Sequence, residues 1–431
     1  MQAQTLNSAE ATRHPASARH EHLLVLPVPF RRVGDELHVE SQARHGLTRW
    51  LDSFATLAVA APVIPEREAS GMRETRWVPL GELAERVHLV PLPWAYRPDH
   101  FVRWLPGTIH ILDGVITESR YLQFAIGGAW GDWAAVAAEL AIRRKRAFSV
   151  HTDRVEHEFV LLAAKNLSLR KRWKARLDAV LIRKWHQRLI ARCHLGLFHG
   201  MDTYVAYKGW MEDAGRGHAI HNIHDIHDEY LDGQLSSKGA GTHCTKLQQN
   251  THLQILYAGR IAAEKAPVDW LKVIARLRDH GVQFNATWAG DGPLRDEFTQ
   301  LLQQQGLDER VDAPGFIADR SQIGSLYRTA DIFMFTHITP ESPRCLLEAL
   351  RFGVPIVGYE SAFARDLIAR HGGGVLVPCD DWAALSAAVA EIASDRTHLS
   401  TLKQHAAADG ERFTSQAVFS ERSELIKRFL A

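Results

Sequence analysis

The fold of this chain is decided by residues 251–294, which read THLQILYAGRIAAEKAPVDWLKVIARLRDHGVQFNATWAGDGPL. The apolar run Leu253–Tyr257 predicts a strand, the glycine and cations after it predict a loop, and Pro267–His280 has the spacing of a helix. A second strand, Gln283–Trp288, and a second glycine turn follow at once. This alternation predicts a parallel sheet that is covered by helices on both faces.

The same alternation continues toward the end of the chain. The predicted elements are, in order, helix Leu294–Gln305, strand Val311–Ala313, helix Arg320–Ala330, strand Ile332–Phe335, helix Cys345–Phe352, strand Ile356–Gly358 and helix Trp382–Ala393. We therefore expect a doubly wound α/β domain over residues 251–396, followed by closing C-terminal helices over 397–431.

A change of composition marks the boundary before this domain. Residues 233–250 read GQLSSKGAGTHCTKLQQN, with almost no large apolar side chain, which is typical of a linker. Residues 22–232 repeat the alternation, beginning with strand His22–Phe30, a loop that contains Gly34, and a helix from about Glu40 to Phe54. Residues 1–21 are polar and lack the apolar segment of a secretion signal, so we expect a flexible leader.

Shorter apolar runs fill the rest of this first half. The predicted strands are Thr56–Ile64, Val87–Leu92, Thr108–Ile111 and Ala147–Val150, and Trp133–Lys145 is a predicted helix. The predicted fold class is therefore α/β, with two Rossmann-like doubly wound domains that face a cleft. Ligands of such domains bind at the carboxyl ends of the parallel strands.

The composition narrows the class of protein. Hydrophobic residues make up 46% and charged residues 23% of the chain, and the formal net charge is only +1, so no overall field favours nucleic acid as a partner. The cysteines, Cys193, Cys244, Cys345 and Cys379, are far apart and form no CxxC pair, which favours a reducing compartment. No apolar run is long enough to span a membrane. We expect a cytoplasmic protein.

Two cations follow the first strand of the second half. Arg260 and Lys265 lie between a strand end and a helix start, where they are suited to hold a diphosphate, and Gly259 permits close backbone approach. A surface turn with two solvated cations explains the same residues. Gly290, in the Gly-Asp-Gly-Pro turn after the next strand, is explained equally by a tight strand-to-helix connection.

A pair of glutamates surrounds a predicted helix start in the segment PESPRCLLEAL, residues 340–350. Ser342, Pro343 and Arg344 would present backbone N–H groups to an anion at this start. Glu341 and Glu348 carry carboxylates that accept hydrogen bonds from sugar hydroxyls. The alternative is a capping carboxylate followed by an exposed helical glutamate.

Taken together and in this order, these motifs resemble the GT-B retaining glycosyltransferases of the group-1 (family four) class, over about residues 251–395. Within that class the Glu-Ser-Pro segment resembles bacterial polysaccharide transferases. The resemblance implies an N-terminal acceptor domain and a C-terminal nucleotide-sugar domain, without a required metal or other cofactor.

The resemblance also assigns roles to single residues. Arg260 and Lys265 would bind the diphosphate, Glu348 the ribose, and Glu341 hydroxyls of the transferred sugar. Gly315, Phe316 and Ile317 would frame the base. The chain departs from the class in one respect, because its two glutamates are seven positions apart where the class has eight.

The first half resembles the class less closely. Gly34 takes the place of a richer glycine loop after the first strand. His151 follows a strand whose terminal histidine approaches the donor sugar in related transferases, although a structural histidine at a strand end is the alternative. His218, His221, His224 and His227 recur every third residue, but this spacing on a strand does not direct ligands to one side, so we expect no metal site.

A basic stretch, residues 170–188, combines cations with tryptophan and leucine. It has the composition of a helix that lies on an anionic membrane, where the enzyme would meet a lipid-linked acceptor. A solvated helix with one face in the core has the same composition. Binding of RNA is a third and weaker alternative. On the first alternative the protein would be peripheral on the inner face of the cell membrane.

These features predict a retaining glycosyltransferase. The enzyme would move a sugar from a UDP- or GDP-linked donor to a polysaccharide or lipid-linked glycan. Two other classes stay open at this point: a GT-B epimerase or hydrolase of the nucleotide sugar, and a catalytically silent GT-B scaffold protein. Turnover of the donor with and without an acceptor separates the three.

Overall fold

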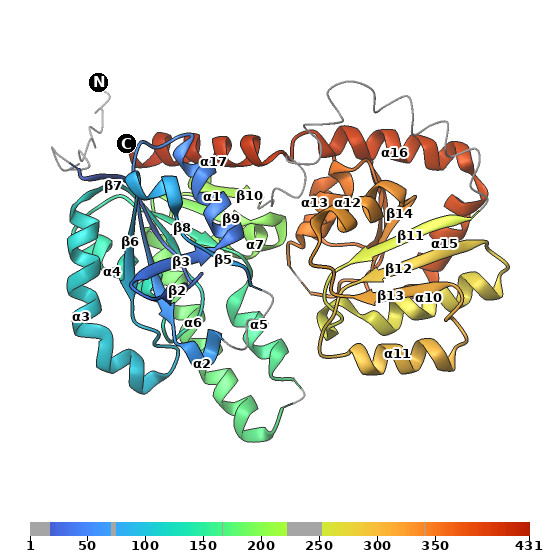
Figure 1. Ribbon diagram of the computed structural model, residues 1–431, viewed down its shortest axis with the longest axis horizontal. Helices are drawn as coiled ribbons and strands as arrows, with labels where there is room; N and C mark the ends of the chain where they lie inside the picture. Colours follow the sequence, from blue (N-terminus) through green and yellow to red (C-terminus); the bar gives the residue numbers. More distant parts are fainter. Residues whose placement is uncertain (1–17, 70–74, 166, 222–251, 340) are drawn as a thin grey trace, which may run out of the picture. The chain divides into compact units, whose positions relative to one another are not determined.

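The structure is a computed structural model, and its chain divides into two units. The first contains the chain up to His199, Thr203–Ile220 and Phe419–Ala431; the second contains Gly200–Asp202 and His221–Val418. The predicted linker, 233–250, and most of the predicted leader lie outside the described residues. The described residues are 18–69, 75–165, 167–221, 252–339 and 341–431 (Figure 1).

The second unit is built on a parallel sheet of six strands in the order β13-β12-β11-β14-β15-β16. The strand order reverses between β11 and β14, and this reversal is the place where doubly wound sheets bind ligands. The strands are β11 Leu253–Ala258, β12 Phe284–Ala289, β13 Val311–Gly315, β14 Ile332–Phe335, β15 Ile356–Tyr359 and β16 Gly374–Val377.

Helices cover this sheet and share one continuous apolar core with it (Figure 1). Trp270, Leu271 and Ile274 are fully buried because the apolar positions of their helix recur every three to four residues. The helices are α10 Pro267–Asp279, α11 Arg295–Gln304, α12 Arg320–Thr329, α13 Arg344–Arg351, α14 Ala362–Leu367, α15 Trp382–Ser394 and α16 Arg396–Gly410.

The first unit has a sheet in the order β10-β9-β8-β7-β1-β4-β2-β3-β5, and β6 also pairs with β4. Strands β10, β9, β8, β7, β1 and β4 run parallel, and β6 and β2 each pair with β4 in parallel. Strand β3 is antiparallel to both of its neighbours, β2 and β5. The strands are β1 His20–Val25, β2 Phe30–Val33, β3 Glu36–Glu40, β4 Leu57–Ile64, β5 Trp77–Val78, β6 Val87–Leu92, β7 Ser119–Ala125, β8 Ser149–Thr152, β9 Leu195–His199 and β10 Gly217–Ile220.

Both faces of this sheet are buried. Alternate side chains of β1 enter different cores, Leu23 and Val25 on one face and Leu24 on the other. The first core contains residues of α3, α4 and α6, and the second contains residues of α1 and α17. The helices are α1 Ser41–Leu51, α2 Glu66–Ala69, α3 Pro98–Thr117, α4 Trp133–Arg143, α5 Glu156–Ala163, α6 Leu169–Arg192, α7 Gly200–Tyr207 and α17 Ser415–Leu430.

Two predictions for the first half are wrong. The run Thr108–Ile111 lies inside helix α3, because its apolar residues continue the helical spacing set by Phe101 and Leu105. The predicted strand His22–Phe30 ends at Val25, because prolines interrupt it, and Phe30 begins β2. Gly34 consequently occupies the turn of the β2–β3 hairpin, with a φ of +60°, and not a turn into a helix.

The closing helices serve both units. α16 packs in the core of the second unit through Leu399 and Leu402, as the apolar spacing predicts. In the last part of α17, Ile426 and Leu430 belong to the first unit's core, and the ring of Phe419 makes an edge contact with Trp50 at 5.2 Å. The end of the chain therefore completes the unit that its beginning starts.

Candidate functional site

An ion pair between a buried lysine and a half-buried glutamate lies at the strand-order reversal of the second unit. Lys265, at the end of the loop after β11, donates a hydrogen bond from Nζ to Oε1 of Glu341, which follows β14. The lysine is 8% exposed. A buried lysine needs an anionic partner, so the structure brings together two residues, 76 positions apart, that the sequence assigned to one site.

Backbone contacts fix the two loops that carry this pair. Thr336 donates its hydroxyl hydrogen to the carbonyl of Lys265 at 2.7 Å, and the N–H of Ile338 donates to the carbonyl of Glu264 at 3.1 Å. The residue after the lysine, Ala266, is left-handed, with a φ of +43°, and Pro267 then begins α10. The loop is held in a strained geometry that directs the lysine inward.

Glu348 is buried on α13, with 8% of its surface exposed, and its Oε2 accepts a hydrogen bond from the hydroxyl of Tyr327 at 3.0 Å. Burial and the neighbouring carboxylate raise the pKa of Tyr327 well above its ordinary value, so this phenol stays a donor. The ring of Tyr327 stacks on Phe352 at 5.2 Å, which fixes its direction. The alternative of an exposed helical glutamate is therefore wrong for Glu348.

A neutral pair accompanies the lysine. The hydroxyl of Tyr257, near the end of β11, lies 2.9 Å from Nε2 of His337, just after β14, and both residues are buried. Burial and the charge of Lys265 keep the pKa of His337 well below its ordinary value, so the ring is neutral. Burial raises the pKa of the nearby Cys345 thiol to about 12, which excludes a thiolate nucleophile at neutral pH.

Sequence reasoning missed Tyr257, Tyr327 and His337. The available signal was the position of two of them, because Tyr257 and His337 are polar residues at the carboxyl ends of strands that flank the strand-order reversal. Tyr327 lies inside helix α12 and has no such signal.

Close backbone packing explains Gly290 and Gly292 of the second unit. A Cβ on Gly290 would lie 2.0 Å from the carbonyl oxygen of Gly259, and one on Gly292 would lie 2.4 Å from that of Ile261. The N–H of Gly259 donates to the carbonyl of Ala289 at 2.9 Å. The turns after β11 and β12 therefore lie directly against each other. Their role in donor binding stays a prediction.

The other predicted donor residues lie at the same edge of the sheet. Arg260 is exposed and donates to Glu264 at 2.8 Å. Gly315 ends β13 with a φ of +83°, followed by the exposed ring of Phe316 and the half-buried Ile317. Helix α13 begins at Arg344 with Pro343 as its N-cap residue, and Ser342 before it is buried.

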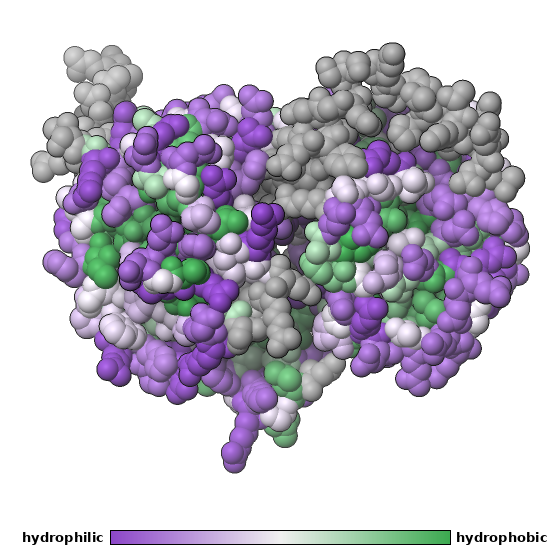
Figure 2. All heavy atoms as spheres, in the orientation of Figure 1, coloured by the Kyte–Doolittle hydropathy of each residue, from purple (hydrophilic) through white to green (hydrophobic). Residues whose placement is uncertain are grey.

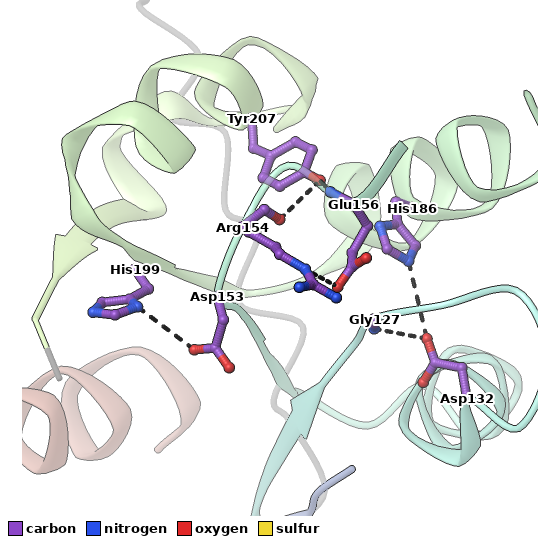
Figure 3. A network of polar contacts seen from close by, with 8 residues as sticks. All are labelled: Gly127, Asp132, Asp153, Arg154, Glu156, His186, His199 and Tyr207. Carbon is purple, nitrogen blue, oxygen red and sulfur yellow. Dashed lines mark hydrogen bonds and ion pairs between the residues drawn. The ribbon is translucent and has the colours of Figure 1, made fainter. Parts of the chain in front are cut away.

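The first unit has its own polar cluster at the carboxyl ends of β8 and β9. His151 lies in β8 with its Nε2 3.3 Å from Oδ1 of Asp153, and Nδ1 of His199, the last residue of β9, lies 3.7 Å from the same oxygen (Figure 3). Desolvation raises the pKa of Asp153, but the imidazoles and the guanidinium of Arg422 lower it more, so the net shift is downward. Asp153 therefore lies within ion-pair distance of both imidazoles, and no motif in the sequence marks Asp153 or His199.

The histidine repeat does not gather in the part of the chain that can be described. His218 lies in β10 and its ring contacts Phe429 at 5.4 Å, whereas the ring of His221 contacts Phe413 at 5.1 Å. His224 and His227 lie outside the described residues. Among the described residues no cluster of three or more histidine, cysteine or acidic side chains is placed to hold a metal ion. No helix among them has the length and hydropathy of a membrane span.

Comparison with known proteins shows which family the second unit resembles. Residues 245–409 match the family model described as Glycosyl transferases group 1. An α-1,4-N-acetyl-D-galactosaminyltransferase of Campylobacter jejuni, whose name specifies a PP-undecaprenol-linked glycan, is 32% identical over 156 residues, covering 35% of this chain and 42% of its own. A GDP-mannose-dependent phosphatidylinositol dimannoside mannosyltransferase of Mycobacterium tuberculosis is 27% identical over 134 residues, covering 30% and 34%.

The likeness to solved structures extends over nearly the whole chain. The crystal structure of Anabaena HepE in complex with UDP superposes with a TM-score of 0.63 at 16% identity, covering 95% of this chain and all of that one. By sequence, in contrast, the chain matches less than half the length of the curated relatives. The second unit therefore carries a domain of the glycosyl transferases group 1 family, and the chain has the GT-B fold of two Rossmann-like units.

Proposed function

We propose that this protein is a retaining glycosyltransferase that moves a sugar from a UDP- or GDP-linked donor to a polysaccharide or lipid-linked glycan. The observation that carries the proposal is the ion pair of the buried Lys265 with the half-buried Glu341 at the strand-order reversal of the second unit. A cation kept there is suited to a diphosphate, since the loops of doubly wound sheets bind nucleotides at this position.

The chemistry follows from the residues around the pair. Lys265 exchanges Glu341 for the diphosphate and, with Arg260, offsets the charge that develops on the departing phosphate. Glu341 is then available to the hydroxyls of the transferred sugar, which His151 also contacts. Glu348, held by Tyr327, accepts hydrogen bonds from the ribose. This mechanism needs no protein nucleophile and no metal ion.

The names of similar proteins support the substrate classes. HepE was crystallised with UDP, the mycobacterial relative is GDP-mannose-dependent, and the Campylobacter relative acts on an undecaprenol-linked glycan. The base and sugar of this chain's donor are chosen by loops that differ among such proteins, so both nucleotides belong in the test.

Thermal-shift binding against UDP-, GDP- and ADP-sugars tests the donor site. We expect stabilisation by one nucleotide class, abolished by Lys265→Ala and by Glu348→Gln. The matched control is Lys272→Ala, because Lys272 is a half-exposed lysine of the same unit that pairs with Asp269 at 2.9 Å on helix α10. Absence of binding by the wild-type protein, or equal binding by all variants, would reject the proposal.

Turnover then decides between the remaining classes. A transferase releases the nucleoside diphosphate quickly only when a glycan acceptor is present, and NMR of the product shows the donor's anomeric configuration. A hydrolase or epimerase consumes the donor without an acceptor, and a scaffold protein does not consume it at all.

A second part of the proposal is that the enzyme is cytoplasmic and works on the inner face of the cell membrane. Helix α6 exposes a row of apolar side chains at helical spacing, Leu169, Trp173, Leu177 and Val180, each more than half exposed. Exposed cations lie between them, including Lys171, Arg172 and Arg176. Figure 2 shows hydrophobic and hydrophilic side chains side by side at the end of the first unit where Figure 1 draws α6.

This arrangement matches an anionic lipid surface better than solvent. Apolar side chains of this size rarely stay exposed in a row, and cations beside them are attracted to acidic headgroups. In flotation assays we expect binding to vesicles of phosphatidylglycerol and phosphatidylcholine, but not to phosphatidylcholine alone, with loss for Trp173→Ala combined with Leu177→Ala. Trp104→Ala is the control, since Trp104 is an exposed tryptophan on α3. Vesicle binding unaffected by the double variant would refute this part.

A further inference from the structure

Three aromatic side chains stand on two loops at the carboxyl edge of the first unit's sheet. Trp94 and Tyr96 follow β6, and Trp130 follows β7. Both strands run parallel to the β1–β4 pair that lies between them, so their loops leave the same edge. The rings of Trp94 and Tyr96 meet at 4.6 Å and 71°, and Tyr96 is 41% exposed. Trp94 and Trp130 are half-buried.

The loop after β6 is held in place from several sides. The indole N–H of Trp133 donates to the carbonyl of Pro93 at 2.8 Å, and the hydroxyl of Tyr96 donates to the carbonyl of Pro27 at 3.4 Å. Gly131 has a φ of +76°, and a Cβ there would lie 2.9 Å from the ring of Tyr96. The second loop is therefore closely fitted to this ring, and the aromatic surface is preorganised.

The loop after β7 is held by hydrogen bonds on its buried side and is exposed on its other side. Asp132 is buried and accepts hydrogen bonds from the N–H groups of Gly127 at 2.8 Å and Ala135 at 2.9 Å (Figure 3). Gly128, next to this anchor, is exposed, and a Cβ on it would meet no atom within 4 Å. Gly128 therefore faces open space at the surface.

Core packing explains only part of this aromatic group. Phe101 and Trp133 are buried and stack at 4.9 Å. Trp130 belongs to this packing, because its ring meets Phe101 at 6.0 Å and its indole N–H donates to Asp178 at 3.4 Å. Tyr96 adds little to that core, because much of its ring remains exposed. Exposed tyrosine and tryptophan rings combine an apolar face with a polar edge. A pyranose ring has the matching surface, with C–H groups on one face and hydroxyls around its rim.

We infer that Trp94 and Tyr96 form a platform on which a pyranose ring of the glycan acceptor stacks. The inference rests on the proposed function, which requires a glycan acceptor, and it lies wholly within the first unit. Stacking favours a neutral sugar ring and does not select one hydroxyl pattern, so hydroxyl contacts decide which sugar is accepted.

Saturation-transfer NMR tests the platform with a panel of methyl glycosides of glucose, galactose, mannose, N-acetylglucosamine and N-acetylgalactosamine, and with hexanol as an apolar probe. We expect saturation of ring C–H protons of at least one pyranoside. Tyr96→Ala and Trp94→Ala should weaken this binding roughly tenfold. Tyr96→Phe keeps the ring and should keep the signal, as should Trp104→Ala, a matched exposed tryptophan outside the platform.

Each outcome separates this inference from the donor-site proposal. Pyranoside signals that are equal in wild type, Tyr96→Ala and Trp94→Ala, or absent from the wild type, would overturn the platform. Saturation of hexanol but of no pyranoside would assign the surface to lipid chains and overturn it too. Donor binding that depends on Lys265 is measured on the same samples, so its loss would reject the proposed function independently. Circular dichroism of each variant confirms folding, and if one of the two alanine variants does not fold, the other carries the test.

Discussion

The two sheets present different chemistry at the same edge. In the second unit a loop carries the buried Lys265, which is paired with the half-buried Glu341, and helix α13 carries the buried Glu348, which is held by Tyr327. In the first unit the loops carry partly exposed aromatic rings such as Tyr96. A site for an anion needs cations protected from water, whereas a site for a neutral ring needs accessible apolar surface.

The largest expected effect is on ligand affinity, and it distinguishes donor binding by the second unit from pyranoside binding by the first. Lys265→Ala should lower donor affinity about 100-fold, because a charge-assisted hydrogen bond in a partly dry site is lost, and should leave pyranoside binding unchanged. Tyr96→Ala should do the reverse. Steady-state kinetics with donor and acceptor varied separately measure both effects. If each variant changed the KM for donor and the KM for acceptor equally, the assignment of donor binding to the second unit and of acceptor binding to the first would be refuted.

Backbone packing gives the next effect. Gly290→Ala should destabilise the second unit by about 2–3 kcal/mol, because the new Cβ would lie 2.0 Å from a carbonyl oxygen. Gly114→Ala is the contrast in the first unit, since Gly114 is exposed inside α3 and its Cβ would meet nothing within 4 Å. It should stabilise by about 0.5–1 kcal/mol. Thermal unfolding of both variants checks the signs, and a neutral Gly290→Ala would contradict the structure.

Acid should act on the first unit through a buried histidine. Burial lowers the pKa of His22 from 6.5 to about 3, where its ring lies between Trp50 and Phe54. Between about pH 6.5 and 3, His22 is therefore protonated in the unfolded chain but neutral in the folded chain. As a result, the free energy of unfolding falls as the pH drops through this range, by up to about 1.4 kcal/mol for each pH unit. Above pH 6.5 this contribution is constant.

Replacing His22 separates its pH-dependent contribution to the free energy of unfolding from that of Asp132, which has the opposite sign. Burial raises the pKa of Asp132 to about 7, so its proton favours the folded state between about pH 4 and 7. His22→Gln should flatten the loss of stability below pH 6.5, measured by denaturant unfolding at several pH values. His280→Gln, an exposed position in the second unit, is the control. Identical pH profiles for His22→Gln and wild type would disprove the assignment.

The smallest effect concerns helix capping. The side chain of Asp381 accepts a hydrogen bond from the N–H of Ala384 at 2.8 Å and begins α15. Asp381→Ala should cost about 1 kcal/mol, while Asp381→Ser should restore most of it. Thermal unfolding detects the difference. Loss of stability in both variants would show that the charge matters more than the cap.

The second unit was predictable because its signals are local. Strand Ile332–Phe335 has the predicted bounds, and Pro267 begins α10 as its place after a loop predicts. The pairing of Lys265 with Glu341 was not predictable from spacing, since it depends on which strands become neighbours. The resemblance assigned both residues to one site, and the structure shows that they are in direct contact.

The elements and the polar cluster of the first unit were harder to predict from the sequence, for physical reasons. Its α3 contains Pro106 and a run of apolar residues at Thr108–Ile111 that has the length of a strand, so a helix and a strand compete for the same pattern. The cluster of His151, Asp153 and His199 joins the ends of two neighbouring strands, and only sheet pairing brings them together. The aromatic platform likewise depends on loops from β6 and β7 meeting.

The return of the chain's end to the first unit affects how the protein is made. Ile426 and Leu430 fill a core begun by β1 and α1, and Lys427 lies over the ring of Phe54 at 4.9 Å. During synthesis the first unit must wait, with part of an apolar face uncovered, until the ribosome has finished the whole second unit. The unit that begins first is therefore the one whose core is closed last, because α17 leaves the ribosome only after the whole second unit.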